Sequence, residues 1–126
     1  MTGAWSVLRS ANRQSLAALL LFLGCAKPVA LTAGDVAGTY AFELKGRSDE
    51  LTLRPDGTYR HAAGGPATEG RWRLDSMQGT TWLHLDGFDP WWQPGTPRGE
   101  LATFFQRREG RLEIRVPGAP VWYLRR

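Results

Sequence analysis

Cysteine is nearly absent from this 126-residue sequence: Cys25 is the single one, so the chain forms no internal disulfide bond. Long apolar runs are absent too. The charge-free stretch 16–24 has about half of the roughly 20 apolar residues that a membrane-spanning helix needs. After residue 25, no segment of useful length repeats its apolar residues at the 3.6-residue period of an amphipathic helix. These absences exclude a disulfide-built scaffold and an α-helical domain, and they argue against a permanent membrane span at the N-terminus.

The sequence also has no large excess of one charge and few motifs of catalytic sites. There are 16 Lys and Arg residues against 12 Asp and Glu residues, and loss of Arg9 and Arg13 with an N-terminal segment leaves 14 against 12. The basic side chains are interleaved with acidic ones, so we predict no nucleic-acid partner. The chain has no Gly-x-Ser-x-Gly, no His-Glu-x-x-His, no phosphate loop and no paired carboxylates in a plausible cleft. We therefore predict that the protein is not an enzyme and holds no metal and no cofactor.

The N-terminal segment has the order of features that marks an export signal. Two arginines without any acid precede the charge-free stretch 16–24, and Lys27 and Pro28 would interrupt a continued helix. The end of this stretch, Phe22-Leu23-Gly24-Cys25, resembles the bacterial lipoprotein signal, in which small residues precede a cysteine that receives a diacylglyceryl group. A buried helix with an incidental thiol is the alternative. The position of the only cysteine favours the signal, which predicts a signal peptide at 1–24.

The lipoprotein resemblance implies a location and an anchor. Cleavage before Cys25 removes 24 residues and leaves 102, and the resemblance implies that several acyl chains, palmitate among them, tether Cys25 to a membrane. The second residue of the processed chain is Ala26 and not the Asp that tends to retain such proteins in the inner membrane. We therefore expect a lipid-anchored protein of the bacterial cell envelope, at the outer membrane, with residues 25–37 as lipidated cysteine and tether.

Residues 38–126 have the pattern of a small β domain. Apolar and polar residues alternate in several short runs, as in Tyr40, Phe42 and Leu44, which is typical of half-buried strands. Residues with turn chemistry separate the runs, notably Pro55-Asp56-Gly57 and Glu109-Gly110. About eight strands joined by tight turns predict an all-β, antiparallel up-and-down meander that closes, or nearly closes, as a barrel. Side chains alone can fill such an interior, and large rings are available for it: Trp72, Trp82, Trp91, Trp92 and Trp122.

Four pieces of this pattern resemble the bacterial lipocalin-like lipoproteins. They are Gly38-Thr39-Tyr40, the run 51–59 with Asp56-Gly57-Thr58-Tyr59, the run 69–74 with Gly70-Arg71-Trp72, and Leu83-His84-Leu85. Tyr40 stands where the family has a tryptophan that plugs the base of the barrel. The resemblance implies a barrel that holds a small apolar ligand or an envelope component.

The segment 86–99 is the strongest candidate for a binding site, because it is the longest irregular stretch and the only one rich in aromatic residues. An exposed tryptophan pair flanked by prolines would form a stiff apolar platform for a ligand or for a protein partner. In the second case the segment would act as an interaction or inhibitor module of the envelope. The alternative is that the rings fold back and plug a small core. The predicted ligand- or partner-binding residues are Phe88, Trp91, Trp92, Gln93 and Trp82.

Histidines and arginines offer weaker candidates. His61 and His84 could belong to a metal or acid–base group with Asp86 and Asp89, but zinc takes three or four converging ligands and no pattern brings the two histidines together. His84 is expected at the surface. The basic residues near the C-terminus could contact lipid phosphates or anionic peptidoglycan, although solvated strand faces explain most of them: Arg107, Arg108, Arg111, Arg115, Arg125 and Arg126.

Overall fold

The structure is a computed structural model in which residues 30–126 are described. These residues form one helical turn, α2 (Ala33–Val36), and eight strands. The strands are β1 (Gly38–Leu44), β2 (Arg47–Leu53), β3 (Thr58–Ala62), β4 (Thr68–Met77), β5 (Thr80–Phe88), β6 (Gly99–Arg108), β7 (Arg111–Arg115) and β8 (Trp122–Arg125).

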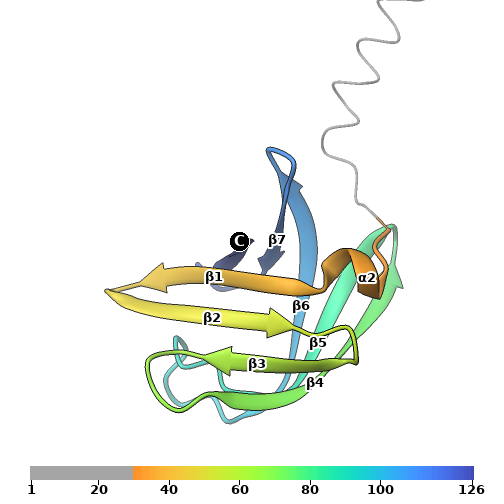
Figure 1. Ribbon diagram of the computed structural model, residues 1–126. Coiled ribbons are helices and arrows are strands. Elements are labelled where there is room, and N and C mark those ends of the chain that lie inside the picture. Colours follow the sequence, from red (N-terminus) through yellow and green to blue (C-terminus); the bar gives the residue numbers. More distant parts are fainter. Residues whose placement is uncertain (1–29) are drawn as a thin grey trace, which may run out of the picture.

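Each strand pairs antiparallel with the next, and β8 pairs with β1, so the sheet closes into a barrel (Figure 1). The prediction of an all-β, eight-stranded, up-and-down barrel is thereby confirmed. The signal at 1–24 and the lipidated Cys25 lie outside the described residues. Among residues 30–126, no helix combines the length and the apolar character needed to cross a membrane.

The up-and-down order gives the barrel two different ends. One end, which we call the loop end, carries the connections 45–46, 63–67, 89–98 and 116–121. The other, the helix end, carries α2 and the turns 54–57, 78–79 and 109–110. Figure 1 shows α2 at the start of β1, with the β1–β2 turn at the far end of that strand.

Three of the tight turns share one chemistry. Lys45-Gly46, Gln78-Gly79 and Glu109-Gly110 each have positive φ at both residues, between 52° and 80°. This backbone matches the twist of paired strands, and glycine adopts it without the steric cost of a Cβ atom. The turn predicted at Glu109-Gly110 is therefore present.

The short helix α2 lies within the expected tether. Its first turn is closed by a capping box, in which the Thr32 side chain accepts from the Asp35 N–H and the Asp35 carboxylate accepts from Thr32 N–H at 2.8 Å. A single turn is too short to show a helical period, so the sequence pattern did not reveal it.

The interior of the barrel is filled with side chains. Alternate residues of every strand point inward, and most of the apolar ones are less than 8% exposed. Tyr40, Tyr59 and Tyr123 are fully buried and supply much of the volume. The rest of the core consists of Val36, Leu51, Leu53, Trp72, Leu83, Leu85, Phe88, Phe105, Leu112, Ile114, Val116 and Val121.

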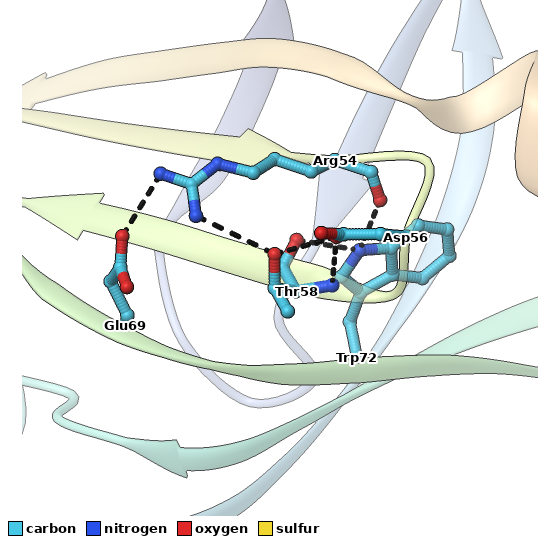
Figure 2. Close-up of polar contacts among 5 residues, drawn as sticks. All are labelled: Arg54, Asp56, Thr58, Glu69 and Trp72. Carbon is cyan, nitrogen blue, oxygen red and sulfur yellow. Dashed lines mark hydrogen bonds and ion pairs between the residues drawn. The ribbon is translucent and has the colours of Figure 1, made fainter.

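The β2–β3 turn explains why the Asp-Gly-Thr and Gly-x-Trp pieces occur together (Figure 2). Asp56 accepts hydrogen bonds from the N–H and the hydroxyl of Thr58, at 2.9 and 2.6 Å. The Trp72 indole N–H donates to the carbonyls of Arg54 and Thr58, at 3.0 and 2.9 Å. These residues form the turn and fix it to β4, which assigns Asp56 a structural role.

Tyr40 closes the helix end. Its hydroxyl donates to the Val36 carbonyl at 2.6 Å, so the ring and α2 are joined. Arg125 lies 5.9 Å from the ring centroid and donates to the carbonyls of Asp35 and Ala37, at 2.7 and 2.9 Å. A tyrosine and an arginine thus hold the helical turn against this end of the barrel.

Candidate functional site

The aromatic segment predicted at 86–99 is shorter in the structure. Asp86, Gly87 and Phe88 belong to β5 and Gly99 begins β6, which leaves 89–98 as the irregular part. The register of β5 against β6 shifts between Leu85 and Phe88, and Gly87 has a φ of 65°. This bulge continues the strand past Asp86-Gly87, two residues that alone favour a turn.

Trp91 and Trp92 are both partly buried and turn toward the loop end of the barrel. Trp91 stacks parallel to Phe42 at 6.1 Å, and the Arg47 guanidinium lies 4.2 Å from its ring centroid. Trp92 packs against the core and makes an edge contact with Phe42 at 5.6 Å. The rings thus cover the end of the barrel and do not project as a free platform.

Beneath these rings, the buried side chains of Asp49 and His61 are hydrogen-bonded to each other and join β2 to β3. The Asp49 carboxylate is fully buried and the His61 side chain is 4% exposed, with 2.9 Å between Oδ2 and Nε2. Trp91 donates its indole N–H to the same oxygen at 2.7 Å. Phe88 stacks on the His61 ring at 4.3 Å. We call Asp49, His61, Trp91, Trp92 and Tyr123 the loop-end cluster.

Three polar atoms of this cluster form no hydrogen bond of regular geometry within residues 30–126: Asp49 Oδ1, Trp92 Nε1 and the Tyr123 hydroxyl. Such atoms are rare in folded proteins, because each loses its contact with water and gains nothing in return. The Tyr123 hydroxyl nevertheless lies close enough to the Asp49 side chain to interact with it. Burial is the main cause that raises the pKa of Tyr123 well above its ordinary value, and the charge of Asp49 and a hydrogen bond with its side chain raise it further. The hydroxyl is therefore neutral, and it keeps a proton that it can donate.

The other predicted residues lie elsewhere or make other contacts. Trp82 is on the outer face of β5, where its ring packs against Phe104 at 5.4 Å. Gln93 contributes its main-chain N–H to the turn, as a donor to the Pro90 carbonyl at 2.9 Å. Phe88 is buried beside His61. The structure therefore brings Phe88, Trp91 and Trp92 together and leaves Trp82 apart.

The two histidines are separate. His84 lies on the outer face and is paired with Glu100 at 2.8 Å, whereas His61 points inward. In the part of the chain that the structure describes, no three His, Cys, Asp or Glu side chains converge as metal ligands would. Asp49 and His61 have the chemistry of an acid–base pair, but Trp91 and Phe88 cover them in this arrangement.

The pairing of Asp49 with His61 was missed by the sequence reasoning. Asp49 is in the charged run 47–50, which favours an exposed hairpin. Strand alternation carried the missing signal, since Asp49 shares its face with Leu51 and Leu53.

A recess in the surface reaches the edge of the loop-end cluster. It has a volume of about 700 Å³ and lies along the β1–β2 hairpin beside Arg126. Its lining includes Phe42, Arg47 and Asp49, which belong to the loop-end cluster or contact it, together with Glu43, Ser48 and Glu50. None of the binding residues predicted from the sequence lines it. Its lining includes several charged side chains, so it does not match the apolar site expected from the sequence.

The fold and the loop-end cluster define the chain as a closed, eight-stranded up-and-down β-barrel protein with an aromatic cover at one end. Comparison with protein-family models, with curated proteins and with solved structures gives no match.

Proposed function

We propose that this chain is a lipid-anchored protein of the bacterial cell envelope that binds a small, largely apolar ligand at the loop end of a lipocalin-like barrel. The observation that carries the binding role is the loop-end cluster, where three buried polar atoms without a hydrogen bond of regular geometry lie among aromatic rings. The filled interior argues for a ligand at this end and against one deep in the barrel.

The cluster supplies what a small-ligand site needs. Asp49 Oδ1 can accept a hydrogen bond, and Trp92 and Tyr123 each have a proton to donate. The rings of Phe42 and Trp91 would contact the apolar part of the ligand. Entry requires that segment 89–98 moves away, which breaks the hydrogen bond between Trp91 and Asp49.

The binding role is tested by native mass spectrometry of the full chain after gentle purification. We expect a small molecule to be retained by the wild type and by Asp75→Asn, a control at an exposed position of β4. Asp49→Asn keeps the shape of the side chain and removes its charge, so it should lose the molecule. Equal retention by both variants would contradict the role given to Asp49.

The alternative function is that of a protein-interaction or inhibitor module that uses the same segment. It is favoured by the outer half of the segment, because residues 94–98 are exposed and include Pro94 and Pro97. Co-purification of a stoichiometric protein without any small molecule would support this function. In both cases we propose a binding role without catalysis.

Anchoring is tested separately, since it rests on Cys25. Replacement Cys25→Ser removes the thiol that would carry the lipid, so a labelled fatty acid should no longer be incorporated and the unprocessed precursor should accumulate. If Cys25→Ser is labelled and partitions into membranes as the wild type does, the chain is not anchored in this way.

A further inference from the structure

A recess at the helix end gathers positive charge. It has a volume of about 280 Å³ and lies between α2, the β6–β7 turn and β8. Its lining consists of Asp35, Arg107, Gly110, Arg111, Leu112, Arg125 and Arg126. Four guanidinium groups therefore surround a space that contains one carboxylate.

The topology explains how these arginines meet. Arg107 and Arg111 lie on either side of the tight turn at Glu109-Gly110, one register position apart on the β6–β7 hairpin. β8 pairs with β7 and adds Arg125, and Arg126 follows it. Residues that form no continuous run in the sequence thus share one end of the barrel.

The guanidinium groups of three of these arginines contact neutral oxygens. Arg107 donates to the Gly110 carbonyl at 3.4 Å, and Arg111 donates to the Arg125 carbonyl. Arg125 donates to the carbonyls of Asp35 and Ala37. No ion pair within residues 30–126 joins any of the three to a carboxylate, whereas Arg126 pairs with Glu50 at 2.9 Å. Carbonyl oxygens orient these groups but leave their charges uncompensated.

The one acid of the recess is engaged in the capping box. Hydrogen bonds from Thr32 are the main cause that lowers the pKa of Asp35, and the charges of Arg107 and Arg125 lower it further. The carboxylate stays ionised and held by Thr32 at 2.8 Å, so it offsets only one of the four positive charges and the recess remains positive.

We propose that this recess binds a phosphate group. A tetrahedral phosphate accepts hydrogen bonds from several directions, and planar guanidinium groups bind it through paired N–H donors. A volume of about 280 Å³ admits the group together with part of its substituent. The phosphate is that of a lipid headgroup or a free phosphate in solution, and both present the same chemistry to the arginines.

The position of the recess favours a lipid headgroup as the source of the phosphate. Only this part of the proposal rests on the proposed anchoring. Seven residues lie between Cys25 and the start of α2, and the eight steps along the chain span at most about 29 Å when extended. A lipid on Cys25 would hold the helix end toward the membrane, where headgroup phosphates are abundant.

The test uses the full chain and two probes: inorganic phosphate followed by calorimetry, and vesicles of phosphatidylglycerol with phosphatidylcholine against vesicles of phosphatidylcholine alone. The test variant Arg107→Gln/Arg111→Gln removes two exposed guanidinium groups of the recess and spares Arg125, which holds α2. The matched control Arg60→Gln/Arg71→Gln removes the same charge from exposed positions on β3 and β4.

Phosphate binding that falls about fivefold or more in the recess variant, and less than about twofold in the control, supports the proposal with a free phosphate as ligand. If inorganic phosphate does not bind but phosphatidylglycerol vesicles do, with the same dependence on the variants, the ligand is a lipid headgroup. Equal effects of the two variants, or no binding of either probe, overturn the proposal. The vesicle comparison uses Cys25→Ser backgrounds, so a failed anchor and a failed recess give different results.

Discussion

Replacement Trp91→Phe isolates the hydrogen bond that fixes the aromatic segment to the barrel. The phenyl ring can keep the parallel contact with Phe42, whereas the N–H that lies 2.7 Å from Asp49 is lost. The acceptor is a fully buried carboxylate, and hydrogen bonds to charged groups contribute about 1.5–3 kcal/mol. Because Trp91 is only partly buried, we expect the free energy of unfolding to fall by about 2 kcal/mol. For a domain of this size, this lowers the midpoint of thermal unfolding by roughly 8–16 °C.

A double-mutant cycle with Asp49→Asn tests the cause of that loss. When Asp49→Asn is already present the acceptor is neutral, so Trp91→Phe should cost about 1 kcal/mol less than in the wild type. The control is Trp122→Phe, because this ring also lies beside a guanidinium group, that of Arg115 at 4.9 Å. Within residues 30–126 its indole N–H does not donate to a carboxylate. It should change stability by less than about 0.5 kcal/mol. Equal costs of Trp91→Phe in both backgrounds would refute the assignment to Asp49.

Two further predictions concern the core and the helix end. Gly70→Ala should destabilise the fold by about 1–3 kcal/mol in denaturant unfolding, since an added Cβ would lie 2.5 Å from the buried Tyr59 ring, while Gly99→Ala meets nothing within 4 Å and should cost far less. Burial raises the pKa of Tyr40 to about 12, against 10.0 in a free side chain, so the unfolded chain ionises first. The contribution of Tyr40 to stability is full below pH 10 and should fall as the pH rises from about 10 through 12. The free energy of unfolding, measured across this range, should therefore decline less steeply with pH in Tyr40→Phe than in the wild type. An equally steep decline in both would contradict the burial argument.

Most of the fold follows from local patterns in the sequence. Glu109-Gly110 sets a hairpin whose geometry depends on two residues, and the alternation around Leu51 and Leu53 sets the inward face of β2. Such features are decided within a few residues of the chain, so eight strands and their order could be predicted.

The site was less accessible to the same reasoning because its contacts are long-range. Trp91 meets Asp49 across 42 positions in the sequence, and no local pattern tells whether the indole is free or bonded. The extension of β5 to Phe88 depends on a bulge at Gly87, which reads locally as a turn. The segment was therefore identified, but its burial and its polar partners were not.

The seam between β1 and β8 has a consequence for biosynthesis. These strands share two residue pairs, Tyr40 with Arg125 and Ala41 with Leu124, and the N–H of Arg126 adds a bond to the Thr39 carbonyl. The chain is synthesised from the N-terminus to the C-terminus, so β1 has one unpaired edge until β8 has been made. The edges of β1 and β7 stay open to pairing with other chains during this interval. The barrel therefore closes only when its last strand is available, and loss of that strand would convert it into an aggregation-prone open sheet.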